Sequence, residues 1–352
     1  MSRHTCAAVL VLAACGKSPS QRPPAPAGDA AQGAATPAPA PVPAAYAETS
    51  ARTLREGRAA LALFQGGKLA ELHARFTPEL AAIATTKVLT DIHDQLKAAA
   101  APGPDDDTVF LVAGSRAYVA DLKVGPQTVV AQMTFDDDGR LSGLNFAPRP
   151  ALPPDPHAGR ALKTKLRLPF DGQWWVFWGG DTATRNYHVV APDQRHAYDI
   201  VMWKDGGTHT GDGKRNEDYH CWGQPIVAPA DATVVAIENG APDNPPGKMD
   251  PANKAGNHVV LDLGDGEFAL LAHLQQGSVT VKAGDKVTRG QRLGLTGNSG
   301  NTSEPHLHFH VQDGPVLFEG RGLPVVFDGV CTDGQPAAPA SPVHGQFIEH
   351  CG

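Results

Sequence analysis

Two histidines separated by a single residue, His306 and His308, are the strongest chemical signal in the chain. They lie in residues 304–310, which read E-P-H-L-H-F-H. Side chains two residues apart on a β-strand point to the same face, so the two imidazoles would lie side by side. Imidazole nitrogens bind zinc at about 2.0–2.1 Å, and one ring of such a pair can bind the metal while the other reacts. A polar strand with incidental histidines has the same spacing, so the pair alone leaves both interpretations open.

Asp199 is the second candidate, because it lies in an apolar stretch between Tyr198 and Ile200. Burying a carboxylate there is costly unless it is paired or bound to a metal. Two histidines precede it, His188 and His196. His196 is three residues away and would point to the opposite face of a strand, so the spacing favours His188 as the partner and keeps His196 as the alternative.

His273 ends the hydrophobic run 270–274 and is the third candidate. A histidine in that position is more often a hydrogen-bonded core residue than a catalyst, and it gains a functional meaning only beside the other candidates. His310 is expected on the same side of the strand as His308. His258 could contact the metal-binding residues without binding the metal itself.

Four further histidines of the second half of the chain lie outside these segments. His209 and His220 belong to a Gly- and Asp-rich insert, residues 204–222, which is more simply a solvated loop than a substrate-binding arm. His344 and His350 lie in a Pro- and Ala-rich tail and are expected to be exposed to solvent.

The elements around the candidates are predominantly strands. Beyond the proline-rich segment 147–156 the chain has short apolar runs separated by Gly-rich turns, which predicts an all-β sandwich or a partly open barrel. The clearest predicted strands are 232–238, 257–263, 267–274 and 278–282.

Residues 47–148 have a different pattern. Helical spacing of apolar residues predicts helices at 51–65, 69–76 and 79–99, and Gly and Asp turns then separate predicted strands at 108–113, 115–124, 127–135 and 141–146. Helices followed by an antiparallel meander make an α+β domain. It resembles the small cone-like domains of the nuclear-transport-factor or cystatin type, and it carries no catalytic constellation, so we assign it a binding or spacing role.

The N-terminus begins with a basic residue and an apolar run too short to span a bilayer. The run ends in L-A-A-C at residues 12–15, which resembles the lipobox of bacterial lipoproteins. That resemblance implies cleavage before Cys15, lipidation of Cys15 and, because Gly16 follows, anchoring in the outer membrane facing the periplasm. A plain secretory signal is the alternative.

The bulk composition narrows the function further. The chain has 352 residues and a net charge of -7, which argues against non-specific nucleic-acid binding. An exported chain can form disulfides. Cleavage and lipidation would leave Cys221, Cys331 and Cys351; one pair can form, and a bridge between the last two would staple the tail, but the sequence does not fix the pairing.

Together the candidate residues resemble the lysostaphin and LytM-type zinc endopeptidases, which cleave peptidoglycan peptides. The resemblance covers about residues 166–328. Besides the H-L-H motif it includes V-K-A-G-D-K-V-T-R-G-Q-R-L-G at 281–294, G-N-S-G at 297–300 and P-I-V-A-P-A-D-A-T-V-V at 225–235. It implies a barrel-sandwich hybrid with an antiparallel sheet groove that holds one zinc ion.

The resemblance also implies residue roles. Asp199 and His308 match zinc ligands, whereas His306 and His273 match the catalytic pair that does not bind the metal. Ligation by two histidines and one aspartate leaves a coordination place for water, as hydrolysis requires.

The remaining ligand departs from the common pattern. Most members of the family have a histidine four residues before the aspartate, where this chain has Arg195. In a branch with an upstream histidine, His188 fills that role, and His196 is again the alternative.

The implied organisation is a signal peptide (1–14), a Pro/Ala-rich linker (15–46), an α+β accessory domain (47–148), a linker (149–165), the peptidase domain (166–328) and a C-terminal tail (329–352). The expected partners are stem or cross-link peptides of peptidoglycan, and the membrane through the lipid anchor. One rival is a catalytically inactive module of the same fold that regulates other wall hydrolases. Another is a lipoyl- or biotinyl-carrier-like module, which leaves the histidines unexplained.

Overall fold

The computed structural model describes residues 38–103, 105–112 and 115–351. The expected signal peptide, Cys15 and the linker up to residue 37 therefore lie outside the described residues. Within the described part of the chain, no helix combines the length and apolar character needed to cross a membrane.

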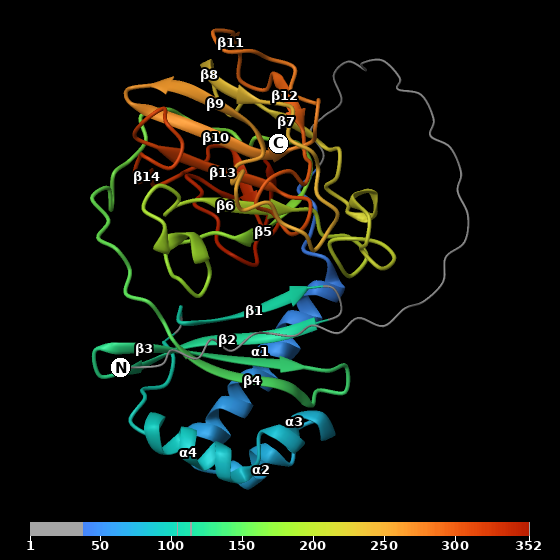
Figure 1. Ribbon diagram of the computed structural model, residues 1–352, viewed down its shortest axis with the longest axis vertical. Coiled ribbons are helices and arrows are strands. Elements are labelled where there is room, and N and C mark those ends of the chain that lie inside the picture. Colours follow the sequence, from blue (N-terminus) through green and yellow to red (C-terminus); the bar gives the residue numbers. More distant parts are fainter. Residues whose placement is uncertain (1–37, 104, 113–114, 352) are drawn as a thin grey trace. The chain divides into compact units, whose positions relative to one another are not determined.

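The first half of the described chain is an α+β unit, as expected from the sequence. Four helices precede a four-stranded antiparallel sheet of order β1-β2-β3-β4, and the helices lie against one face of that sheet (Figure 1). The elements are α1 (Ala44–Gln65), α2 (Leu69–His73), α3 (Pro78–Ile83), α4 (Thr86–Leu96), β1 (Asp107–Val112), β2 (Ser115–Val124), β3 (Gln127–Phe135) and β4 (Leu141–Pro148).

Close packing of α1 on β2 depends on a glycine. A Cβ atom at Gly57 would lie 2.1 Å from Cγ of Tyr118, so only glycine lets the helix approach the ring this closely. The single helix expected over 79–99 is divided in two. The first part, α3, ends at Ile83, and Thr85 caps α4 by accepting a hydrogen bond from the Val88 amide at 3.4 Å.

The second half is built almost entirely of antiparallel strands, which confirms the expected all-β class. Its main sheet has eleven strands in the order β11-β8-β9-β10-β13-β6-β5-β17-β15-β16, with β14 beside β13, and a separate pair joins β12 to β7. The strands are β5 (Trp174–Trp178), β6 (Tyr198–Val201), β7 (Pro225–Val227), β8 (Ala232–Glu238), β9 (Asn257–Gly264), β10 (Glu267–Leu274), β11 (Lys286–Val287), β12 (Arg292–Leu295), β13 (Leu307–Gln312), β14 (Gly322–Leu323), β15 (Val330–Thr332), β16 (Gln335–Ala337) and β17 (Phe347–His350).

The centre of this sheet positions the candidate residues. Figure 1 shows β10, β13 and β6 as neighbouring strands, and the register places Ala272 opposite His308 and His308 opposite Asp199. Leu307 and Phe309, which alternate with His308, are fully buried in the main hydrophobic core on the other face. The strand period of two therefore sends apolar side chains into the core and polar ones to the site.

Two expectations about this half are wrong. Residues 278–282 form no strand, although the Thr280 amide donates to the Leu293 carbonyl at 2.8 Å. His344, expected in solvent, is only 5% exposed, because the tail folds back and both of its ring nitrogens lie within hydrogen-bonding distance of backbone carbonyls.

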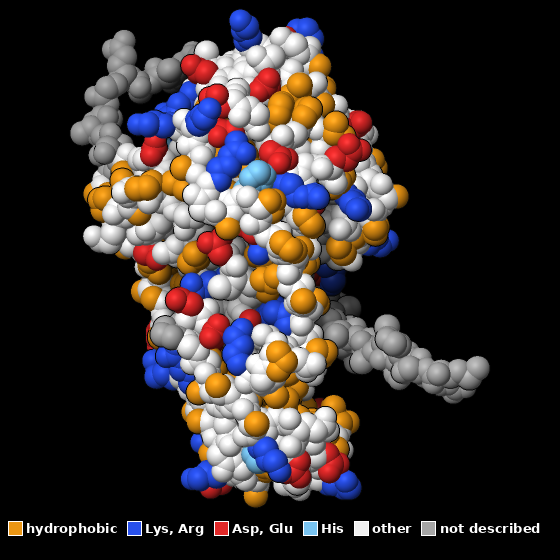
Figure 2. Space-filling model, turned by 90° about the vertical axis from the view of Figure 1, so that its left-hand side faces the viewer, with side chains coloured by type: hydrophobic (Ala, Val, Ile, Leu, Met, Phe, Trp, Pro, Cys, Tyr) orange, Lys and Arg blue, Asp and Glu red, His pale blue; other side chains and the backbone are white. Residues whose placement is uncertain are grey.

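The tail is part of the main sheet. Strand β17 pairs with β5, and β15 pairs with β17. A disulfide joins Cys331 to Cys351 across 5.1 Å between their Cα atoms, and Cys221 is a free, buried thiol. On the face shown in Figure 2, basic and acidic side chains are interspersed among uncharged ones.

Candidate metal centre and catalytic cleft

Three side chains from distant parts of the chain converge at the centre of the main sheet. Asp199 on β6 and His308 on β13 are direct neighbours across the strands, and the 3-10 helix η1 (Tyr187–Val190) brings His188 beside them. One ligand atom from each of the three lies within 4.8 Å of the others, and all three residues are buried.

His188 is held in one orientation by Asn186. The Asn186 amide nitrogen donates to the carbonyls of Gly180 at 2.9 Å and Ala197 at 3.0 Å, which turns its oxygen toward Nδ1 of His188 at 2.8 Å. An amide oxygen only accepts, so Nδ1 carries the proton and Nε2 keeps its lone pair.

The free Nε2 of His188 is the feature that indicates a bound metal ion. Nε2 of His188 is buried, has no hydrogen-bond partner among the described residues, and lies 3.5 Å from Oδ2 of Asp199. Burial lowers the pKa of His188 to about 3, despite the opposing charge of Asp199. A neutral imidazole with an unsatisfied buried lone pair fits a metal ion.

His308 is oriented by a chain of hydrogen bonds along its own strand. The Gln312 amide nitrogen donates to the carbonyls of Gly314 at 2.6 Å and Val316 at 2.9 Å, so the Gln312 oxygen must face Nε2 of His310, at 3.1 Å. His310 therefore carries its proton on Nε2 and offers the Nδ1 lone pair to His308.

The orientation of His310 determines the tautomer of His308. Nε2 of His308 lies 2.9 Å from Nδ1 of His310 and donates to it, and Nδ1 of His308 is the nitrogen that faces Oδ1 of Asp199, at 2.8 Å. In the neutral ring the Nδ1 lone pair is therefore available to a metal ion bound beside that carboxylate. Burial, followed by the charge of His308, lowers the pKa of His310 to about 3 and keeps this ring neutral. The protein thus presents a second imidazole lone pair beside the first.

Asp199 supplies the negative charge. Burial alone would raise its pKa, but the neighbouring His188 and His306 rings outweigh burial and hold the pKa well below the usual range. Two imidazole lone pairs and one carboxylate are a donor set that suits zinc, and three protein ligands leave one place open. The residues present therefore fit such an ion.

His306 lies beside the three candidate ligands. Its Nδ1 donates to the Glu304 carbonyl at 2.9 Å, and its Nε2 lies 3.5 Å from Oδ1 of Asp199. Burial opposes protonation, but the Asp199 charge and hydrogen bond outweigh it, so the pKa of His306 is raised. Its Nε2 points to the same region as the candidate ligands.

His273 is placed by an irregularity in its strand. The pairing of β10 with β9 shifts between Leu271 and Leu274, and His273 has a φ of 62°, a left-handed conformation unusual for a histidine. Its Nδ1 bonds to the Ser299 carbonyl at 2.9 Å, which leaves Nε2 free, and its ring centroid lies 4.8 Å from that of His306. Burial lowers its pKa well below the usual value.

Comparison with known families bears on this arrangement. Residues 216–319 match the model of peptidase family M23. This part of the chain is an M23 peptidase domain. His273, His306 and His308 lie inside the matched residues, whereas His188 and Asp199 precede them, so the structure is what joins both groups into one site.

Several curated proteins resemble this chain over a limited stretch. The peptidoglycan DD-endopeptidase ShyA of Vibrio cholerae is 37% identical over 105 residues, which cover 29% of this chain and 21% of ShyA. The cell division protein DipM of Caulobacter vibrioides is 30% identical over 110 residues, covering 30% of this chain and 16% of DipM. The matched stretch thus spans about a fifth or less of the length of these two relatives.

Among solved structures, the antimicrobial peptidase lysostaphin from Staphylococcus simulans is 20% identical, with a TM-score of 0.28. The match covers 44% of this chain and 50% of the lysostaphin chain.

Two cavities in the second half of the chain flank the candidate ligands. A small one of about 70 Å³ is lined by His273, His308 and Lys254, and a larger one of about 310 Å³ is lined by Asp199, His306 and Glu304 among others. Tyr187 and Asn301 line both. The two cavities therefore adjoin at these residues, and together we call them the cleft.

The other histidines considered in the sequence lie elsewhere. His196 faces Asp155 at 3.1 Å and Asp181 at 3.2 Å, so it does not join the candidate ligands. His209 packs against Tyr219 within the insert, and His258 faces the carbonyl of Gly256.

Sequence reasoning missed the residues that orient the ligands. Asn186 and Gln312 were not singled out, and neither were Tyr187 and Lys254, which line the cleft. Only the polar character of residue 312 at the end of an apolar strand was a usable signal for any of them.

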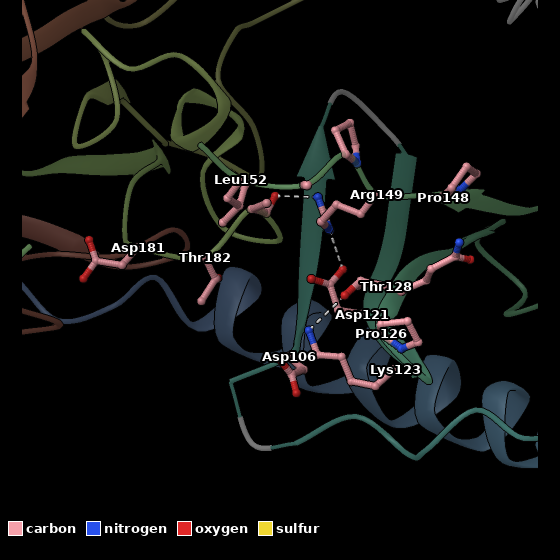
Figure 3. A pocket seen from close by; sticks show the side chains of 14 residues that line it. Asp106, Asp121, Lys123, Pro126, Thr128, Pro148, Arg149, Leu152, Asp181 and Thr182 are labelled. Atoms are coloured by element: carbon pink, nitrogen blue, oxygen red, sulfur yellow. Dashed lines mark hydrogen bonds and ion pairs between the residues drawn. The ribbon is translucent and has the colours of Figure 1, made fainter. Parts of the chain in front are cut away.

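A further cavity of about 410 Å³ lies away from this site and is lined by Asp106, Asp121, Arg149 and Thr182 among others (Figure 3). Arg149 already forms a salt bridge with Asp121 and donates to the Ala183 carbonyl at 3.0 Å. No histidine or cysteine is among its described lining residues, and we assign it no chemistry.

Proposed function

We propose that this chain is a zinc-dependent endopeptidase that hydrolyses peptide bonds of peptidoglycan in the cell envelope. The observation that carries the proposal is the pair of imidazole lone pairs, on His188 and His308, fixed beside the buried Asp199 carboxylate. Two further histidines with free nitrogens, His306 and His273, lie within reach of the same space.

Each group has a distinct task in the proposed hydrolysis. Zinc, held by His188, Asp199 and His308, would polarise the scissile carbonyl and lower the pKa of the attacking water. Nε2 of His306 and Nε2 of His273 face the cleft as proton acceptors. Once protonated, a ring of this pair can return its proton to the leaving amine or stabilise the charge that develops on the carbonyl oxygen.

The wall substrate is supported by the limited similarity to ShyA, a peptidoglycan DD-endopeptidase. The lipobox-like residues at 12–15 support an exported location with a lipid anchor at Cys15, on the periplasmic side of the outer membrane. A cleft made of two adjoining cavities suits a peptide strand better than a small metabolite.

The test is incubation of the chain carrying Cys15→Ser with purified peptidoglycan sacculi, with and without a chelator. We expect release of new amino groups, loss of that release with the chelator, and its return with zinc. The zinc content of the protein is measured in parallel, and expected at about one ion per chain. A chain that binds no zinc and opens no bond in any sacculus type would instead be a binding module that regulates other hydrolases.

A further inference from the structure

The two halves of the cleft differ in charge. Among the described residues lining the smaller cavity, Lys254 is the one charged amine, and none is acidic. The larger cavity is lined by Asp199 and Glu304 and has no lysine or arginine among its described residues. The Lys254 ammonium therefore attracts a negatively charged group of a substrate to the smaller cavity, whereas the described residues of the larger cavity offer that group no lysine or arginine.

The Lys254 ammonium is available for such a group. It lies 5.1 Å from the centroid of the Phe318 ring, an arrangement that steadies a cation without neutralising it. Within the described part of the chain, Lys254 forms no salt bridge.

The backbone that carries Lys254 is fixed relative to the catalytic histidine. The Lys254 carbonyl accepts from the Asn301 amide at 3.1 Å, and the next carbonyl, that of Ala255, accepts from the His273 amide at 3.1 Å. A Cβ atom at Gly256 would lie 2.2 Å from the Ser299 carbonyl oxygen, so this loop lies directly against the segment that also holds His273.

The size of the smaller cavity restricts the group that enters it. Its volume of about 70 Å³ holds a few heavy atoms, such as a carboxylate, but not a long side chain. The larger cavity, at about 310 Å³, has room for the bulkier part of a peptide and offers the Phe177, Trp178 and Tyr187 rings to it.

We propose that Lys254 and the small cavity form a carboxylate subsite, which selects peptides with a carboxylate on the carbon next to the scissile nitrogen. The inference rests on the proposed function and names its substrate class, acyl–NH–CHR–COO⁻. Hydrolysis adds hydroxyl to the acyl carbon and a proton to the nitrogen, which releases an amino acid centre whose carboxylate remains free.

The geometry of such a substrate matches the cleft. A carboxylate on that carbon lies two bonds from the scissile nitrogen, so a scissile amide placed over His188, Asp199 and His308 sends the carboxylate to a neighbouring pocket. His308 and His273 line the small cavity directly. Two sources have this chemistry: a cross-link between D-alanine and the D-centre of a diamino acid, and the carboxyl-terminal residue of a linear peptide.

The test uses two matched pairs of substrates. One pair is a cross-linked muropeptide dimer and the same dimer with the carboxylate next to the scissile amide converted to a carboxamide. The other pair is a linear acyl-dipeptide ending in a carboxylate or in a carboxamide. Each pair keeps the size of the group and changes its charge.

For the zinc-loaded full chain we expect kcat/KM at least tenfold higher for the carboxylate member of a pair than for its carboxamide. Lys254→Gln is expected to reduce that ratio below about threefold, with an unchanged zinc content, and Lys254→Arg to keep most of it. Lys286→Gln, an exposed lysine of β11 away from the cleft, controls for the change in net charge and is expected to match the parent chain.

A binding measurement separates this inference from the proposed function. The zinc-loaded His306→Ala chain, with and without Lys254→Gln, is titrated with both members of each pair. Tighter binding of the carboxylate member that depends on Lys254 supports the subsite even if no substrate is cut, in which case only the proposed function fails. Equal cleavage and equal binding of both members overturn the subsite and leave the proposed function standing.

The two substrate pairs also show whether the recognised carboxylate belongs to a cross-link or to the end of a linear peptide. A preference confined to the dimer assigns the subsite to the D-centre of a cross-link. A preference in the linear pair alone assigns it to chain ends, and a preference in both supports recognition of the shared carboxylate.

Discussion

Nε2 of His308 lies 2.9 Å from Nδ1 of His310, and the direction of this hydrogen bond decides whether Nδ1 of His308, which faces Asp199, keeps its lone pair. A ring that donates from Nε2 keeps its Nδ1 lone pair for a metal. His310, two residues beyond the candidate ligand His308 on the same strand, is thus a positioning residue.

Removal of that residue is expected to weaken metal binding. His310→Ala leaves the Nε2 proton of His308 without its acceptor and frees the ring to rotate, so we expect zinc affinity to fall by about 10- to 100-fold. His310→Gln, whose side-chain oxygen can accept the same proton, is expected to restore part of the loss. Competition with a fluorescent chelator measures the affinity, and an unchanged affinity in His310→Ala would contradict the proposed relay.

The two histidines of the H-L-H motif are expected to differ when each is replaced by alanine. His308→Ala should lose zinc and activity together, because it removes a candidate ligand. His306→Ala should lose activity but retain zinc, because its nitrogen acts on the proton rather than on the metal. Metal analysis beside a peptide-hydrolysis assay tests both, and equal loss of zinc in the two variants would overturn the assignment.

Acid is expected to destabilise the metal-free protein. Burial lowers the pKa of His188 and of His310 to about 3, whereas the unfolded chain protonates these residues near 6.5. Between pH 6.5 and 3 the unfolded state therefore binds more protons, and the free energy of unfolding falls as the pH falls. At pH 5 the loss is about 2 kcal/mol for each group.

One opposing group does not reverse this trend. The raised pKa of His306 adds stability as the pH falls toward 6.5 and contributes no further change below it. The lowered pKa of Asp199 acts in the same direction as the two histidines, but only below about 3.8. Urea unfolding of the chelated protein at pH 7 and pH 5 measures the effect, and His310→Gln should show a smaller difference; equal stabilities at the two pH values would refute the prediction.

Reduction of the disulfide is expected to loosen the tail. Cys331 and Cys351 are separated by 20 residues, and closing a loop of that length stabilises a folded chain by about 3 kcal/mol. We expect Cys331→Ser with Cys351→Ser to lower the melting temperature to the value of the reduced parent chain. Cys221→Ser, which alters a free thiol, is the control; a double variant as stable as the oxidised parent would show that the bridge adds nothing.

The sequence predicted the fold class and most strands because their alternation of apolar and polar residues is local. The same parity argument favoured His188 over His196 as the partner of Asp199, and the structure brings Asp199 and His308 together with His188 rather than with His196. In contrast, His344 was misplaced, because a proline-rich composition concealed short strands that the disulfide and the β5–β17 pairing hold in the sheet.

The orienting residues could not be predicted for a different reason. Asn186 acts through the carbonyls of Gly180 and Ala197, which reach it only after the chain has folded. His273 depends on a shifted register between two strands, and no residue pattern marks such a bulge in advance. The chemistry of the side chains can be predicted from composition and spacing. Which of two groups donates in a hydrogen bond between them cannot.

The anchoring of Gln312 on the carbonyls of Gly314 and Val316 places a surface turn in control of the buried imidazoles. An insertion in that turn would let the amide rotate, and the tautomers of two rings would follow. A homologous chain could in this way lose activity while keeping all of its metal-coordinating side chains. The presence of those side chains alone therefore does not show which homologues are active.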